Sequence, residues 1–311
     1  MNALRSPRLL VLTLLLTLWA SGCSREAKRD RALRRAQSYL ADEQYEKAGL
    51  ELQNVLRLDP TNHTARLQMA RVFFEQGSPL RAMQVIQTVG GRVEDPVLRC
   101  RVAEFKIGAG DRVGGRNELV GLLSQSPTNR EALLALAGST LTPQEATNTL
   151  AYLRQFDSKY PNAAPLLLAQ GVVLARMGQF PSAEQFVQRA LQADPKLAQA
   201  HIHQAQLLLM HSNVTAAEKA FETGVRLAPY RSPIRLADAQ RKAGSGRTEE
   251  ARAAMAEILK HAPDYLPAIL VQARLETQER KFDQALALTT RVLARDPFSL
   301  ETRQLRTQLY A

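Results

Sequence analysis

The sequence predicts an all-α solenoid, in which one helix–turn–helix repeat is stacked about eight times. Apolar residues make up 45% of the 311 residues and aromatic residues only 5%, which favours close helix packing over a β-sandwich. A 34-residue spacing of prolines is the strongest observation, because a fixed period of this length is typical of units that bury their apolar faces against neighbours. The prolines are Pro127, Pro161, Pro195, Pro229, Pro263 and Pro297.

Two columns of small residues keep the same period, apart from one step of 33 residues. Small side chains let two antiparallel helices approach closely, so each period predicts a pair of helices. Proline then ends the second helix, because it has no N–H to donate. The first column is Ala36, Ala70, Ala103, Ala137, Gly171, Ala205, Ala239 and Ala273. The second is Ala48, Ala82, Gly115, Thr149, Ala183, Ala217, Ala251 and Ala285.

This pattern resembles the tetratricopeptide repeat, which implies a right-handed α-solenoid. The resemblance covers residues 29–299, and residues 300–311 read as a C-terminal capping helix with a polar outer face. Pro60 extends the proline column upstream. The eight expected repeats are 29–62, 63–95, 96–129, 130–163, 164–197, 198–231, 232–265 and 266–299.

Repeats two to four depart from the pattern. Repeat two ends at Gly90-Gly91 without a proline in register, and repeat three has Gly115 where alanine is usual. Repeat four has Pro143 in its turn and Thr149 in its small-residue column. We expect weaker packing or a bend in this stretch.

The first 22 residues match a secretory signal peptide. Arg5 and Arg8 precede an apolar run over residues 9–19, which is too short to span a bilayer as a helix. Small residues before Cys23 resemble a bacterial lipobox, and the resemblance implies that this cysteine carries the lipid, including palmitate. An ordinary signal peptide that ends near a cysteine is the alternative.

Residues 23–28 are then expected to form the lipidated N-terminus and a short linker. Ser24 follows the cysteine where Asp would retain a lipoprotein at the inner membrane, so the resemblance implies an outer-membrane anchor facing the periplasm. Acylation of Cys23 leaves Cys100 as a single thiol, which we expect to be a packing residue on an apolar helix.

No sequence motif supports catalysis, a cofactor or a metal, and we expect a protein that is not an enzyme. His201 and His203 are two residues apart, and such positions on a helix point about 200° apart, which does not suit a shared ion. The net charge of +11 leaves two interpretations open: a solvated surface rich in arginine, or attraction to acidic polymers or anionic lipid.

In tetratricopeptide proteins the first helix of each repeat lines a concave groove that takes peptides or helices. Carried over by position, the resemblance implies partner-binding residues on five of these helices. Packing between neighbouring repeats is the alternative role for each. The residues are Leu67, Arg71, Phe74, Leu168, Val172, Ala175, Ile202, Gln206, Leu209, Leu236, Gln240, Leu270 and Arg274.

The resemblance therefore implies a membrane-anchored protein-interaction scaffold for an assembly or secretion system of the bacterial cell envelope. The partner is expected to be another protein, with no nucleic acid and no small-molecule substrate. Two short segments, residues 36–40 and 52–56, resemble sequences of the exosortase-associated group of such lipoproteins. The alternative function is a binder of acidic polymer, polysaccharide or anionic lipid through the arginine-rich surface.

Overall fold

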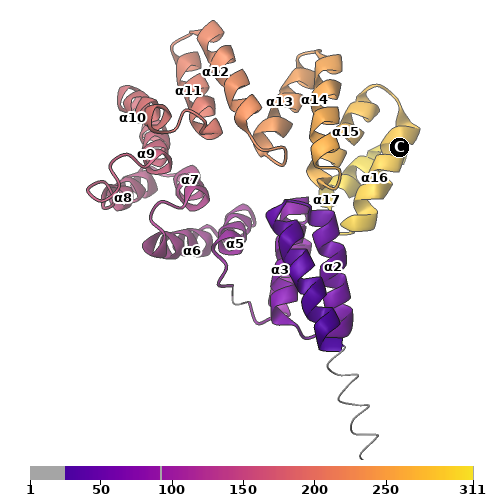
Figure 1. Ribbon diagram of the computed structural model, residues 1–311. Coiled ribbons are helices and arrows are strands. Elements are labelled where there is room, and N and C mark those ends of the chain that lie inside the picture. Colours follow the sequence, from indigo (N-terminus) through magenta and orange to yellow (C-terminus); the bar gives the residue numbers. More distant parts are fainter. Residues whose placement is uncertain (1–24, 92, 311) are drawn as a thin grey trace, which may run out of the picture. The chain divides into compact units, whose positions relative to one another are not determined.

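The computed structural model describes residues 25–91 and 93–310, so Cys23 lies outside the described residues. The chain divides into two compact units, Met1–Arg92 and Val93–Ala311, which are described separately here as the N-terminal and C-terminal units. All regular secondary structure in the described residues is helical (Figure 1). Each of the eight expected repeats contains two helices, which confirms the all-α solenoid.

The N-terminal unit contains repeats one and two. Its first helix covers residues 25–41, so residues 25–28, expected as a linker, are already helical. The helices that follow are α2 (Tyr45–Leu58), α3 (His63–Gln76) and α4 (Pro79–Gln87). Leu52 and Val55 of α2 are completely buried in the core of this unit.

The C-terminal unit contains repeats three to eight and a final single helix. Figure 1 shows the helices of this unit one after another along a curved row. Repeats three to five consist of α5 (Pro96–Gly108), α6 (Arg112–Gln125), α7 (Arg130–Gly138), α8 (Pro143–Arg154), α9 (Ala164–Arg176) and α10 (Phe180–Ala193). Repeats six to eight consist of α11 (Ala198–Met210), α12 (Val214–Leu227), α13 (Pro233–Gly244), α14 (Thr248–His261), α15 (Leu266–Gln278) and α16 (Phe282–Arg295). The capping helix is α17 (Leu300–Tyr310).

Every residue of the two small-residue columns is buried. The backbones of α5 and α6 cross very closely at Gly115. A Cβ atom added to Gly115 on α6 would lie 2.6 Å from the backbone oxygen of Ala103 on α5, which real Cβ atoms essentially never do. Gly115 is therefore required by the short distance between the two backbones.

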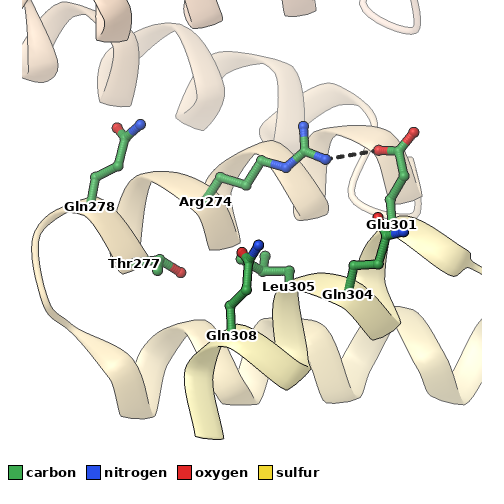
Figure 2. Close-up of a pocket in the computed structure, with 7 residues that line it drawn as sticks. All are labelled: Arg274, Thr277, Gln278, Glu301, Gln304, Leu305 and Gln308. Carbon is green, nitrogen blue, oxygen red and sulfur yellow. Dashed lines mark hydrogen bonds and ion pairs between the residues drawn. The ribbon is translucent and has the colours of Figure 1, made fainter. Parts of the chain in front are cut away.

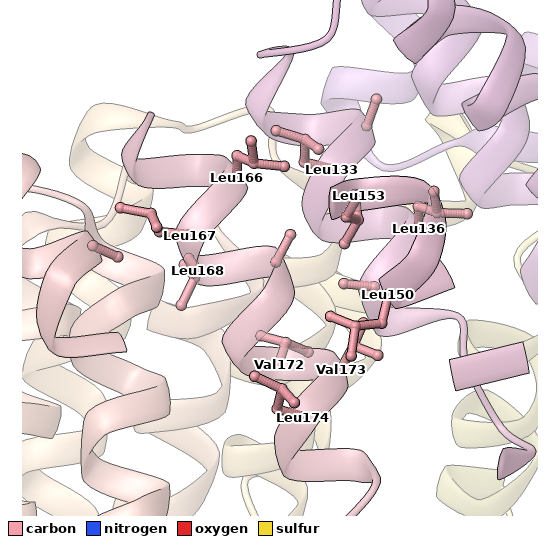
Figure 3. Close-up of a cluster of buried hydrophobic side chains, with 14 of the residues drawn as sticks. Leu133, Leu136, Leu150, Leu153, Leu166, Leu167, Leu168, Val172, Val173 and Leu174 are labelled. Atoms are coloured by element: carbon pink, nitrogen blue, oxygen red, sulfur yellow. The ribbon is translucent and has the colours of Figure 1, made fainter. Parts of the chain in front are cut away.

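Repeat three keeps a closely packed helix pair, whereas the helices of repeat four, α7 and α8, have few contacts with each other and pack mainly against α9. The weaker packing expected in this stretch therefore lies between the two helices of repeat four. One cluster of buried side chains runs from Cys100 to Leu207 and includes residues of both repeats. Figure 3 shows leucines of α7 and α8, such as Leu133 and Leu150, gathered with those of α9. Cys100 is part of this cluster, and burial raises the pKa of its thiol to about 12.

The departures in repeat four have local causes. Pro143 is one of the first residues of α8, where proline is tolerated because the first N–H groups of a helix have no helical partner. Thr142 and Glu145 form a capping box at the same helix start. The hydroxyl of Thr149 accepts a hydrogen bond from Arg116 at 2.7 Å, so the hydroxyl of the buried column threonine has a partner.

Basic side chains satisfy the backbone oxygens of the proline column. Arg66 donates to the carbonyl of Pro60 at 2.7 Å, and Arg189 and Arg291 donate to Pro161 and Pro263 at 3.3 Å and 2.6 Å. Such donors are favourable where a helix ends and leaves carbonyls without partners. Part of the arginine excess therefore closes the loops between repeats.

Gly115→Ala tests the close crossing of α5 and α6. We expect the free energy of unfolding to fall by about 1–3 kcal/mol, because the added methyl meets a backbone atom and forces the helices apart. The measurement is urea unfolding followed by circular dichroism. Gly121→Ala on the same helix is the matched control, because its added Cβ would lie 3.5 Å from the nearest atom, an ordinary contact. The control should be neutral or stabilise by up to about 1 kcal/mol, and equal losses in both variants would contradict the argument.

Candidate functional site

A pocket between α9, α10 and α11 is the candidate functional site. It has a volume of about 310 Å³, which is within the range of ligand pockets. Its lining is mostly apolar, with a few polar groups from α9 and α11. The lining residues are Gly171, Val172, Ala175, Arg176, Phe180, Val187, His203, Gln206, Leu207 and Met210.

Helix α9, which lines one side of this pocket, is apolar along nearly its whole length. Ten of its thirteen residues are buried, so the helix is held from several sides. Gly171 of α9 has no Cβ, and one added there would lie 3.1 Å from Val187 and 3.3 Å from the backbone oxygen of Ala183, both on α10. Gly171 therefore lets α9 and α10 cross closely beside the pocket, which Gly171 and Val187 both line.

Exposed apolar side chains continue the pocket at the end of α11. Met210, which lines the pocket, is 57% exposed, and its neighbour Leu209 is 54% exposed. Methionine adapts its shape to different apolar partners. Gln206, one turn before Met210, is exposed and offers an amide that can donate to and accept from a peptide backbone.

His203 and Arg176 are the ionisable groups of the pocket lining. Burial lowers the pKa of His203 from its ordinary value of 6.5, a hydrogen bond with Gln206 opposes this shift, and the positive charge of Arg176 adds to it. Arg176 donates a hydrogen bond to the backbone oxygen of Thr140 at 2.7 Å, which fixes its guanidinium at the rim. The pocket therefore presents a neutral imidazole and one cation at neutral pH.

A second pocket of about 280 Å³ lies between α15 and α17. It is more polar, and Figure 2 shows Arg274 reaching Glu301, with an N–O distance of 2.9 Å. Its other lining residues are Thr277, Gln278, Gln304, Leu305 and Gln308.

The structure brings some of the expected partner-binding residues together. Val172, Ala175 and Gln206 line the first pocket, Leu209 is exposed beside it, and Arg274 lines the second pocket. Gln240 is exposed on α13, outside both pockets. Leu67, Arg71 and Phe74 lie half-buried on α3 of the N-terminal unit, which is described by itself.

Other expected residues belong to the packing between helices. Leu168 is completely buried, and Leu270 is buried in a cluster with Leu305. Leu236 is half-buried against the core around Met255. Ile202 is half-buried with its side chain beside Gly224 of α12. These side chains lie on the predicted helices but face neighbouring helices.

Sequence reasoning missed Arg176, His203 and Met210 as members of one site. His203 stood out in the sequence, but only as half of a rejected metal pair. In the structure, Nε2 of the neighbouring His201 lies 2.9 Å from the backbone oxygen of Pro195, away from the pocket lining. The signal for Met210 was its spacing of four residues from Gln206, which places both on one face of α11.

His203→Gln tests the burial of the imidazole. The unfolded chain takes up this proton at a higher pH than the folded chain, because the folded pKa is lowered. The stabilisation is therefore complete above the ordinary pKa of 6.5 and is lost as pH falls below it. We expect the free energy of unfolding to fall less between pH 7.5 and 5.5 in the variant than in the wild type, as measured by urea unfolding at both pH values. Equal losses would contradict this assignment.

Comparisons with known proteins agree with this architecture. A model described as tetratricopeptide repeat matches residues 39–98 and 242–309, and a second model with the same description matches residues 168–232. No curated protein sequence matches significantly. No helix among residues 25–91 and 93–310 has the length and apolar character needed to cross a bilayer.

Solved structures are similar at low sequence identity. Yeast Tom70 aligns with a TM-score of 0.54 at 15% identity, over 91% of this chain and 63% of the Tom70 chain. A tetratricopeptide repeat protein from Parabacteroides merdae aligns with a TM-score of 0.41 at 12% identity, over 91% of this chain and 99% of that one. A human IFIT1 dimer with m7Gppp-AAAA aligns with a TM-score of 0.47 at 14% identity, over 80% of this chain and 68% of that one.

The likeness to Tom70 supports the fold alone, whereas the sequence models together cover more than half of the chain. Tetratricopeptide repeats are generally non-catalytic and serve as scaffolds for protein–protein interaction. The paired helices, the buried small-residue columns and both sequence models lead to one conclusion: the chain belongs to the tetratricopeptide repeat family.

Proposed function

We propose that this protein is a membrane-anchored scaffold that binds a peptide or helix of a partner protein in the groove between α9 and α11. The observation that carries this proposal is the apolar pocket of about 310 Å³, continued by the exposed side chains of Leu209 and Met210. An apolar pocket with a few polar groups at its rim buries one or more side chains of a partner and fixes its orientation.

The polar rim defines what the partner segment should present. Gln206 suits an unpaired backbone amide or carbonyl, and Arg176 suits a carbonyl or carboxylate near the pocket edge. A second cation in the pocket would be repelled by Arg176 and would find no carboxylate among the lining residues. The proposed segment is therefore apolar at its centre, and neutral or acidic at its flanks.

The anchor belongs to the same proposal. The signal-peptide pattern and the small residues before Cys23 support acylation of this cysteine, and Ser24 supports the outer membrane with the scaffold in the periplasm. The setting we propose is a cell-envelope assembly or secretion system. The short segments at residues 36–40 and 52–56 favour an exosortase-associated system within that class.

The alternative function is that the many arginines of the protein bind an acidic polymer. The contacts of several arginines in the C-terminal unit argue against it. Arg189 and Arg291 donate to loop carbonyls, and Arg231 forms a buried ion pair with Asp264. Arg252 is shared between Glu276 and Glu279. Side chains held in this way are not free to follow a flexible polyanion.

Photo-crosslinking in the native host tests the groove. A photoreactive residue at position 206 or 210 of the full chain should form an adduct with one partner protein, because both positions line the pocket and are exposed. Position 113 is the matched control, since Val113 is 73% exposed on α6 and does not line the pocket. Met210→Glu should lower the adduct yield at position 206 at least about fivefold, because it places a charge in an apolar contact.

The adduct should persist when envelopes are washed with a few hundred millimolar salt before irradiation, since apolar contacts are not screened. Loss of the adduct in salt, or an equal yield at position 113, would overturn the groove in favour of a charged surface.

Cys23→Ser tests the anchor separately. Without an acyl chain the protein should move from the membrane fraction to the soluble periplasmic fraction, as followed by fractionation and immunoblotting. Metabolic labelling with an alkyne fatty acid should mark the wild type and not the variant. Labelling of the variant would show that Cys23 is not the acylated residue.

A further inference from the structure

The first helix carries a one-sided basic face. Lys28, Arg31 and Arg35 follow the spacing i, i+3 and i+7, which places them on one side of a helix, with Arg34 beside them. All four are exposed. The opposite side is buried through Ala32, Ala36 and Leu40 in the core of the N-terminal unit.

The acidic residues of this segment lie away from Lys28, the residue of the face nearest to Cys23. Glu26 and Asp30 are each two residues from Lys28, so they project to the other side of the helix, and Asp30 lies on the side of Arg34, four residues before it. Asp30 is paired with Arg29, at an N–O distance of 2.8 Å. Of the four basic side chains only Arg35 is neutralised within the described part of the chain, by Glu51 at 2.8 Å. Lys28, Arg31 and Arg34 have no acidic partner among residues 25–91 and 93–310.

These charges begin five residues after Cys23 in the sequence. A lipid attached at Cys23 would hold the start of this helix within a few residues of the bilayer surface. Basic side chains close to an anionic bilayer contribute about 1 kcal/mol each, and the effect falls off within a Debye length. The basic face would thus lie close enough to an anionic bilayer for its charges to be attracted to the headgroups.

We infer that the face formed by Lys28, Arg31, Arg34 and Arg35 docks on anionic phospholipid headgroups. It sets the orientation of the N-terminal unit on the membrane. The inference rests on the proposed lipid anchor for its position, but the binding itself needs no acyl chain. Anionic lipid is favoured over a soluble polyanion because the charges lie together on one exposed side of the helix, next to the proposed anchor site.

Vesicle sedimentation tests this inference without the acyl chain. The protein is residues 23–311 with Cys23→Ser, which keeps every residue that the structure describes. Vesicles of phosphatidylethanolamine with about 30% phosphatidylglycerol should bind it at about 0.1 M salt, whereas phosphatidylcholine vesicles should not. Changing Lys28, Arg31 and Arg34 together to Gln should weaken binding on the order of 100-fold, since three charges are removed. Glutamine keeps the helix propensity of the segment.

The matched control removes three exposed charges from the C-terminal unit, as Lys196→Gln, Lys219→Gln and Lys260→Gln. It should bind vesicles within about twofold of the parent, because these lysines lie outside the basic face. Circular dichroism confirms that both triple variants are folded. Equal weakening by the two variants, or no binding by the parent protein, would overturn the inference. So would tighter binding to dextran sulfate than to the anionic vesicles, which would assign the face to soluble polyanions. None of these outcomes affects crosslinking at position 206, so the proposed peptide-binding groove is tested independently of the basic face.

Discussion

Close approach of paired helix backbones is the constraint on which the rest of this structure depends. At the crossing of α5 and α6 the backbones are so near that even one methyl group at Gly115 would meet the oxygen of Ala103 at 2.6 Å. The buried columns of small residues follow from close pairing of this kind, and their 34-residue period follows from the stacking of such pairs.

The arginine content is explained in part by the loops that this stacking creates. Every expected repeat except the second ends with a proline turn, where a helix end leaves carbonyls without helical partners. A guanidinium reaches the proline carbonyl either from the first helix of the next repeat, as Arg66 does, or from its second helix, as Arg189 and Arg291 do. Arg66 serves Pro60 from the first helix, and His201 occupies the equivalent place beside Pro195. A high net charge in such a protein is therefore weak evidence for a polyanion ligand. A basic face is informative where most of its charges lack an acidic partner, as Lys28, Arg31 and Arg34 do among the described residues of the first helix and its surroundings.

The sequence predicted the repeats well because the period reports on backbone spacing, which local residues decide. Proline, glycine and alanine affect the backbone at their own positions, and these positions set where the helices end and how closely they cross. The site was harder to predict, because the depth of a side chain in a groove depends on residues of the next repeat. Leu168 and Val172 lie one turn apart on the same helix, yet only Val172 reaches the pocket formed with Leu207 and Met210. The role of Arg274 likewise depends on Glu301 of the capping helix.

Gly171 connects the constraint on stacking with the proposed binding. Most first-column positions hold alanine, whereas repeat five has Gly171, which also lines the pocket. A Cβ atom there would lie 3.1 Å from Val187 and 3.3 Å from the backbone oxygen of Ala183, so the missing methyl lets α9 and α10 cross closely beside the pocket. One residue of the column thus takes part both in the packing of its helix pair and in the lining of the proposed binding site. Repeat proteins can therefore acquire a pocket in one repeat while the others continue to supply only the scaffold.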